Sequence, residues 1–177
     1  LEVSDLTVCV EDRAIVANRS FRLEVGQRIA IVGRNGSGKS TLLRGIMNIM
    51  PRERISRVVV GGNRRSNSWD YRKLGEHISY LFEDSEHSFP PDIHLGRVIA
   101  WFCERHRLDA SQIYRRLESV GLSTDVRTRY PMELSGGQRQ LLCFVLATEV
   151  ETKRIVLMDE PFSRLDDHSR LRLIHLV

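Results

Sequence analysis

Cysteine is scarce in this sequence of 177 residues, and long hydrophobic runs are missing from it. The three cysteines, Cys9, Cys103 and Cys143, lie far apart and show no CxxC or Cys/His ligand spacing. This argues against a disulfide framework and a zinc site, and it favours a reducing compartment, the cytoplasm. No apolar run approaches the roughly 20 residues that cross a bilayer. The first residues are typical of a strand rather than of a signal peptide, so we expect any membrane association to come through a partner.

Lysine is also rare, with only Lys39, Lys73 and Lys153 in a chain whose net charge is +4. The other basic residues are arginines, and a basic balance is compatible with nucleic-acid or phosphate binding. Because the arginines are spread along the chain, an ordinary solvated surface explains them better, and we expect no direct contact with nucleic acid. The scarcity of lysine makes Lys39 the more conspicuous.

The hydrophobic periodicity predicts one domain in which a helical segment interrupts an α/β core. Strands are predicted at residues 2–10, 14–17, 21–25, 28–32, 57–60, 77–82 and 154–158. Helices are predicted at residues 39–50, 93–108, 111–120, 136–150 and 166–177. Pro51 ends the first helix, because proline cannot continue it.

A phosphate-loop pattern, GxxxxGK(S/T), occurs between a predicted strand and a predicted helix, the context that this pattern requires. Glycines let backbone N–H groups turn toward phosphate oxygens, and the helix N-terminus adds its positive end. Lys39 can reach the β- and γ-phosphates, while the Ser40 hydroxyl can ligate Mg²⁺. The residues expected to bind the triphosphate are Gly33, Arg34, Asn35, Gly36, Ser37, Gly38, Lys39, Ser40 and Thr41.

Two carboxylates follow the apolar strand predicted at residues 154–158. Ligands bind at the carboxyl ends of parallel strands in an α/β sheet. Asp159 is suited to hold Mg²⁺, and Glu160 is suited to orient and deprotonate the attacking water. An acidic pair after a strand is more often a helix start or a surface loop, but the phosphate loop favours the functional interpretation here.

A third motif begins the helix at residue 136 and consists of Leu134, Ser135, Gly136, Gly137 and Gln138. In this order, with Asp159 and Glu160 following soon after, it resembles the signature motif of ABC ATPases. The run from Ser163 to Asp166 resembles the D-loop of that family, and the run from Phe82 to Asp84 stands where its Q-loop falls. The resemblance covers nearly the whole chain.

The resemblance implies a P-loop NTPase fold of the α/β class with N-terminal antiparallel strands. Residues 1–83 and 151–177 would form the catalytic core, and residues 84–150 a helical subdomain that carries the signature. It also implies a head-to-tail dimer in which the signature motif and Asp166 of one protomer cover the ATP held by the other. Ser135, Gly136 and Gly137 at a helix N-terminus suit that role, because such an end attracts anions.

Glu83 replaces the glutamine that the family carries in its Q-loop. A carboxylate keeps an oxygen for Mg²⁺ or for the attacking water, but it loses the amide donor and adds negative charge. We therefore count Glu83 among the metal-binding and catalytic residues and expect altered, slower turnover. The other interpretation is that Glu83 is a tolerated substitute.

Three further positions depart from the family pattern. No aromatic residue occurs among residues 1–20, and Val10 stands where the family stacks an aromatic ring on adenine. Stacking contributes roughly 1–3 kcal/mol per base, so we expect weaker or less adenine-selective binding. Leu141 and Leu146 replace arginines of many members, and we expect them to extend the core. The sequence ends before the switch histidine of the family, so we expect a C-terminally truncated chain.

The resemblance implies an ATP-hydrolysing subunit of an ABC transporter with ATP and Mg²⁺ as cofactors. A second nucleotide-binding domain would complete the dimer, and a membrane permease would dock on the helical subdomain at the cytoplasmic face. The segment 130–133, before the signature, favours an importer over an exporter. A soluble ABC ATPase that acts on ribosomes or DNA remains an alternative, as does a degenerate regulatory domain.

Overall fold

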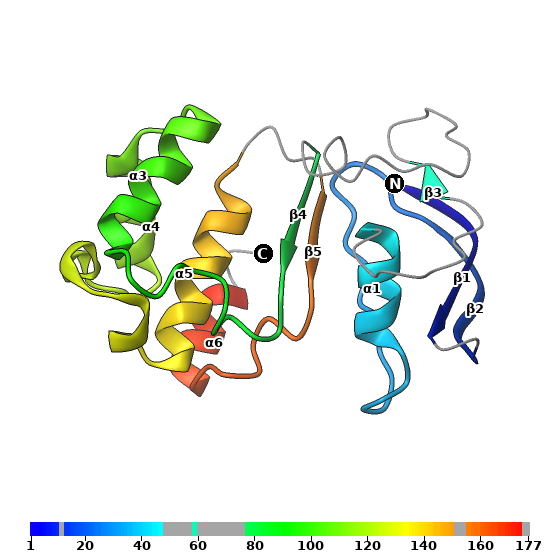
Figure 1. The fold of residues 1–177 in the computed structure, drawn as a ribbon. Coiled ribbons are helices and arrows are strands. Elements are labelled where there is room, and N and C mark those ends of the chain that lie inside the picture. Colours follow the sequence, from blue (N-terminus) through cyan, green and yellow to red (C-terminus); the bar gives the residue numbers. More distant parts are fainter. Residues whose placement is uncertain (11–12, 48–57, 60–76, 151–154, 175–177) are drawn as a thin grey trace. The chain divides into compact units, whose positions relative to one another are not determined.

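The computed structural model describes residues 1–10, 13–47, 58–59, 77–150 and 155–174. The chain divides into two compact units, Leu1–Ile78 and Ser79–Val177. Figure 1 shows the elements of each unit in sequence colours.

The first unit contains an antiparallel sheet with strand order β2-β1-β3. Its strands are β1 (Glu2–Val10), β2 (Arg13–Arg22) and β3 (Val58–Val59). The pairing of β1 with β2 shifts register between Val3 and Leu6, where Asp5 has a φ of 51°. A bulge of this kind changes which side chains share a face, and Val3, Leu6 and Val8 are accordingly all buried. The predicted N-terminal antiparallel strands are confirmed.

Helix α1 (Lys39–Met47) packs against this sheet. Its buried residues are Leu43, Gly45, Ile46 and Met47. A Cβ on Gly45 would lie 2.5 Å from Cγ2 of Val8, so the close approach of helix and sheet requires glycine there. The predicted start at Lys39 is confirmed, and the predicted extension over residues 48–50 lies outside the described residues.

Two predictions for the N-terminal strands are wrong. The strand predicted at 14–17 and residues 21–22 of the strand predicted at 21–25 belong to the single strand β2, and residues 23–25 lie outside it. Residues 28–32 form no strand and belong to neither sheet of the described residues, and Val32 is 88% exposed. An apolar run becomes a strand only where a neighbouring backbone accepts and donates its hydrogen bonds, and hydropathy alone does not supply that neighbour.

In the second unit, β4 (Ile78–Leu81) pairs with β5 (Ile155–Met158). The backbone N–H of Asp159 donates to the carbonyl of Leu81 at 2.9 Å, so the carboxyl ends of both strands lie together. The helices, as Figure 1 shows, lie on one side of this pair. They are α3 (Leu95–His106), α4 (Ala110–Ser119), α5 (Gly136–Thr148) and α6 (Asp167–Ile174), with the 3-10 helices η1 (Thr124–Thr128) and η2 (Pro131–Glu133) before α5.

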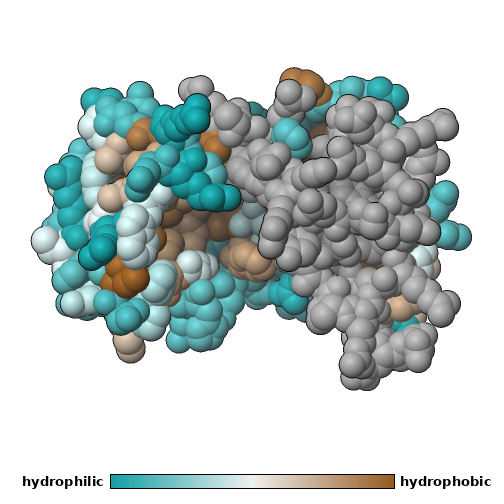
Figure 2. Space-filling view, turned by 45° about the horizontal axis from the view of Figure 1, so that its top comes forward, coloured by the Kyte–Doolittle hydropathy of each residue, from teal (hydrophilic) through white to brown (hydrophobic). Residues whose placement is uncertain are grey.

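The core of the second unit joins these helices to the end of β4. Its fully buried members include Ile99 of α3, Leu117 of α4 and Leu142 of α5. Leu141 and Leu146 belong to the same cluster, which confirms the expectation that they extend the core. The described surface in Figure 2 is largely hydrophilic, with apolar residues in small groups. No helix in the described ranges is both long and apolar enough to span a membrane.

Candidate nucleotide-binding site

The phosphate loop turns tightly before it enters α1. Gly36 and Gly38 have φ values of +76° and +92°, in the left-handed region that favours glycine. The N–H of Ser37 donates to the carbonyl of Arg34 at 3.1 Å. A Cβ on Gly33 would lie 2.7 Å from Oγ of Ser37, so another residue at the start of the turn would require this hydroxyl to rotate away. The loop conformation therefore depends on the glycines of the motif.

Lys39 folds back over this loop from the first residue of α1. Its Nζ donates to the carbonyl oxygens of Gly33 at 3.2 Å and Arg34 at 3.3 Å. The ammonium group thus lies at the N-terminus of a helix, where the positive end of the helix dipole already favours anions. Ser40, the next residue, is half-buried and brings a hydroxyl to the same helix end. A cation, a helix start and a glycine turn together fit a phosphate group.

Asp159 lies at the carboxyl end of β5, where its side chain is 2% exposed. The hydroxyl of Tyr80 donates to Oδ2 of Asp159 at 3.2 Å. Sequence reasoning missed this tyrosine, since it predicted both strands but not that they are neighbours in the sheet. The position of Tyr80 near the end of a predicted strand was the available signal.

Glu160 follows at the turn after β5, and its side chain is exposed. Its φ is +46°, a left-handed conformation that is uncommon for residues other than glycine and costs roughly 1–3 kcal/mol. The carbonyl of Glu160 accepts a hydrogen bond from the N–H of Ser163 at 3.1 Å, which closes the turn. Strained backbone of this kind is frequent at functional sites, and the catalytic role expected of Glu160 stays a prediction.

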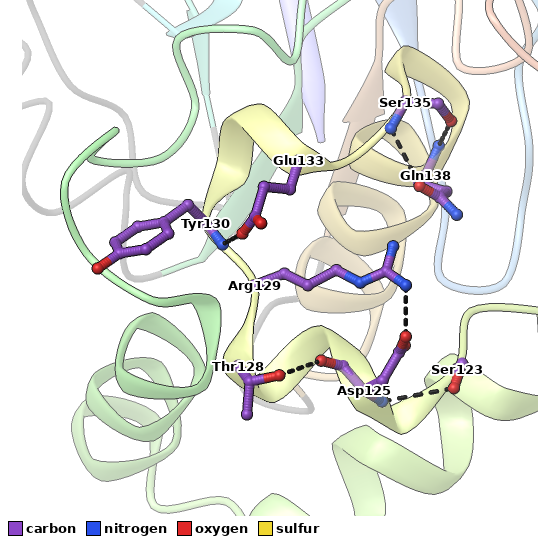
Figure 3. Close-up of polar contacts among 8 residues, drawn as sticks. All are labelled: Ser123, Asp125, Thr128, Arg129, Tyr130, Glu133, Ser135 and Gln138. Carbon is purple, nitrogen blue, oxygen red and sulfur yellow. Dashed lines mark hydrogen bonds and ion pairs between the residues drawn. The ribbon is translucent and has the colours of Figure 1, made fainter.

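The signature motif forms the start of α5 (Figure 3). Ser135 is the N-cap: its Oγ accepts from the N–H of Gln138 at 3.2 Å, and its own N–H donates to Oε1 of Gln138 at 3.0 Å. This reciprocal capping box leaves the N–H groups of Gly136 and Gly137 without acceptors inside the helix. Two donors at the positive end of a helix can bind an anion.

The segment before the signature is held by its own polar contacts. Figure 3 shows the backbone N–H of Tyr130 donating to the carboxylate of Glu133, and Arg129 paired with Asp125. Arg139, which sequence reasoning did not single out, donates from Nη1 to the carbonyl of Leu134 at 2.6 Å. The Arg139 bond and the burial of the Leu134 side chain both fix the residue that precedes the cap of α5.

The D-loop segment packs against the signature helix. A Cβ on Gly137 would lie 3.0 Å from the carbonyl oxygen of Arg164, so Gly137 permits this approach. Asp166 precedes α6 and accepts from the N–H of Ser169 at 2.8 Å and from its hydroxyl at 3.2 Å. The Ser169 N–H holds the pKa of the Asp166 carboxyl below its usual value. Asp166 therefore serves as a helix cap in this structure.

The Q-loop segment also meets α5 and the D-loop. Glu83 is exposed, and Oδ1 of its neighbour Asp84 lies 3.2 Å from Nη2 of Arg164. Gln140 of α5 is completely buried, and its Nε2 donates to the carbonyl of Phe82 at 3.5 Å. The second unit thus brings the Q-loop, signature and D-loop segments together. The phosphate loop belongs to the first unit, and the side chain of Val10 lies outside the described residues.

Known proteins resemble this chain over most of its length. A family model described as ABC transporter matches residues 16–163. The oligopeptide transport ATP-binding protein of Haemophilus influenzae is 30% identical over 169 residues, which cover 92% of this chain and 51% of that protein. The glutathione import ATP-binding protein of Salmonella typhimurium is 32% identical over 169 residues, which cover 92% of this chain and 27% of that protein. The chain thus spans about half the length of the first relative and less of the second.

Solved structures with the same fold include an ATP-binding cassette determined as a dimer in a post-hydrolysis state with ADP and Pi. Its TM-score is 0.81 at 20% identity, with coverage of 99% of this chain and 80% of that chain. An ATP-binding subunit of an ABC transporter gives a TM-score of 0.76 at 24% identity. The match covers 98% of this chain and 71% of that chain. These likenesses confirm the fold class predicted from the sequence.

Proposed function

Since this chain belongs to the ABC transporter family, we propose that it is the ATP-binding and ATP-hydrolysing part of a membrane transporter. The observation that carries the proposal is the position of Lys39, whose ammonium group contacts the Gly33 and Arg34 carbonyls at the start of α1. A buried carboxylate at a strand end and a capped glycine helix start supply the other parts that such an ATPase needs.

In this proposal the loop from Gly33 to Thr41 holds the triphosphate through backbone N–H groups and Lys39. Ser40, Asp159 and Glu83 would hold Mg²⁺, since hydroxyl and carboxylate oxygens are the ligands that this ion prefers. When bound, Mg²⁺ neutralises charge that develops on the phosphates.

Glu160 acts as the general base in this mechanism. Its exposed carboxylate orients a water molecule and takes its proton as the water attacks the γ-phosphate. Lys39 stabilises the negative charge on the phosphate oxygens as the bond to the β-phosphate breaks. Glu83 lies two residues past the end of β4 and adds a third carboxylate to Asp159 and Glu160.

The donors of the signature motif complete the site in a second protomer. The N–H groups of Gly136 and Gly137, with Ser135, would bind the γ-phosphate held by the partner's phosphate loop. Asp166 would contribute from the D-loop, and residues 84–150 would form the helical subdomain. ATP then joins the two protomers, and hydrolysis releases them.

A membrane permease is the second proposed partner, at the cytoplasmic face. The relatives named above are a peptide transport protein and a glutathione import protein, which favours an importer. The permease would dock on the helical subdomain and would determine the specificity for the transported substrate.

Dimerisation tests this function directly. We expect the Glu160→Gln variant of the full-length protein to form a dimer in MgATP and to remain a monomer without nucleotide, as light scattering measures. The matched control combines Glu160→Gln with Lys39→Ala and should stay monomeric in both conditions. A monomer under every condition contradicts the proposal. Purification of the native complex then separates a transporter, which brings a multi-span membrane protein, from an ATPase that brings ribosomes or DNA.

A further inference from the structure

Tyr80 of β4 contacts Asp159, the residue that follows β5. The contact lies at the carboxyl ends of these two neighbouring strands. Oη of Tyr80 lies 3.2 Å from Oδ2 of Asp159. An ionised carboxylate only accepts hydrogen bonds, so the phenol is the donor. Asp159 is 2% exposed and Tyr80 is half-buried, so solvent screens this bond only in part.

Both residues are held in place by their strands. The backbone N–H of Asp159 continues the β4–β5 pairing through the carbonyl of Leu81 at 2.9 Å. The ring of Tyr80 packs against the ring of Phe82, with centroids 4.5 Å apart and planes tilted by 55°. The hydroxyl is therefore brought to the carboxylate by a rigid element and not by a mobile loop.

We propose that Tyr80 is a positioning residue for the metal site: its hydroxyl sets the rotation of the Asp159 carboxylate toward Mg²⁺. This inference rests on the proposed function, in which Asp159 faces the metal of MgATP. Hydrogen bonds to a ligating carboxylate orient it, and their loss typically weakens metal binding by about 10–100-fold. The lower end of this range applies here, because phosphates and water supply most of the ligands of a nucleotide-bound Mg²⁺.

A packing role is the competing explanation, since the Tyr80 ring contacts Phe82. The Tyr80→Phe substitution separates the two roles, because it keeps the ring and removes only the hydroxyl. Tyr130→Phe is the matched control: it removes a hydroxyl from a 38% exposed tyrosine in the same unit, away from Asp159.

The experiment measures binding of a fluorescent ATP analogue to the full-length protein while MgCl₂ is varied. For Tyr80→Phe we expect the half-saturating Mg²⁺ concentration to rise about tenfold. Binding of the analogue in EDTA should stay at the wild-type value, because the contact acts on the metal and not on the nucleotide itself. Tyr130→Phe should match wild type throughout. In an Asp159→Ala background, which removes the acceptor, Tyr80→Phe should add no further change, because the two residues act through one contact.

The outcomes distinguish this inference from the function on which it rests. If wild type binds the analogue with the expected Mg²⁺ dependence and Tyr80→Phe gives the same binding curve, the role of Tyr80 is overturned while the proposed function stands. Equal weakening with and without Mg²⁺ shows a packing role and overturns it as well. Failure of the wild-type protein to bind the analogue overturns the proposed function, and this inference with it.

Discussion

Arg164 and Asp84 form an ion pair, with 3.2 Å between Nη2 and Oδ1, although they lie far apart in the sequence. Arg164 also lies against the signature helix, because a Cβ on Gly136 would lie 3.6 Å from its Cδ. One arginine therefore touches the segment after β4 and the start of α5. Both side chains are at least one-third exposed, so the pair contributes little to stability.

Acid should weaken the fold through carboxylates that accept hydrogen bonds. The Glu86 N–H, and then the Arg164 guanidinium, hold the pKa of Asp84 below its usual value of 3.8. A lowered folded-state pKa contributes stability that is complete above the unfolded value and is lost as the pH falls through the folded value. We therefore expect Asp84→Asn to be less stable than wild type at neutral pH, by urea unfolding, and to approach it as the pH falls below 3.8.

Asp109 provides a second case of this acid effect. The hydroxyl and N–H of Ser111 lower the pKa of its carboxyl, and it is the N-cap of α4. Asparagine caps helices about as well as aspartate, so Asp109→Asn should keep the helix, and its difference from wild type should shrink as the pH falls, as at Asp84. A difference between Asp84→Asn and wild type that is the same at neutral and at acid pH would contradict the account.

Ser135 should have two separable roles. Ser135→Ala removes the acceptor for the Gln138 N–H, so we expect the free energy of unfolding to fall by about 1 kcal/mol. Ser135→Asn restores a capping group and should recover that stability in urea unfolding. Neither variant should form the ATP-dependent dimer, because the hydroxyl that would reach the partner's γ-phosphate is absent. Dimerisation by Ser135→Asn at the wild-type ATP concentration speaks against the trans role.

Substitution of the phosphate-loop glycines should lower stability by different amounts at Gly36 and at Gly38. Gly36 has nothing within 4 Å of an added Cβ, so only its φ of +76° opposes substitution. Gly36→Ala should cost about 1–2 kcal/mol of stability, and Gly36→Asn should cost less, because asparagine tolerates this conformation. At Gly38 an added Cβ would also lie 3.2 Å from Cγ2 of Ile15, so Gly38→Ala should cost more than Gly36→Ala. Thermal unfolding measures the stability of the three variants. Equal losses of stability in all three would contradict this prediction.

Glu83 should slow turnover relative to the glutamine that the family carries. Glu83→Gln removes a negative charge expected near the γ-phosphate and restores an amide donor, so we expect faster phosphate release at saturating MgATP. The exposed position of Glu83 means that folding should not change. An unchanged ATPase rate together with an unchanged Mg²⁺ dependence shows that Glu83 is only a tolerated substitute.

Local sequence signals predicted the helices well, but they did not predict which residues contact the site residues. The glycine and capping patterns placed the starts of α1 at Lys39 and α5 at Gly136, because caps depend on adjacent residues. The strand predicted at 28–32 is wrong, since strand formation depends on a neighbouring backbone. The contacts of Tyr80 with Asp159 and of Arg164 with Asp84 join distant segments, and they follow from strand pairing and helix packing that no local pattern encodes.

Phosphate release from MgATP tests the central claim most directly. The account predicts that the full-length wild-type protein binds and hydrolyses ATP, and that Lys39→Ala loses binding. Glu160→Gln should bind ATP with wild-type affinity and release phosphate at least about a hundredfold more slowly, the effect of removing a general base. Binding and phosphate release that survive both substitutions unchanged would contradict an ATPase site built from the phosphate loop and Glu160.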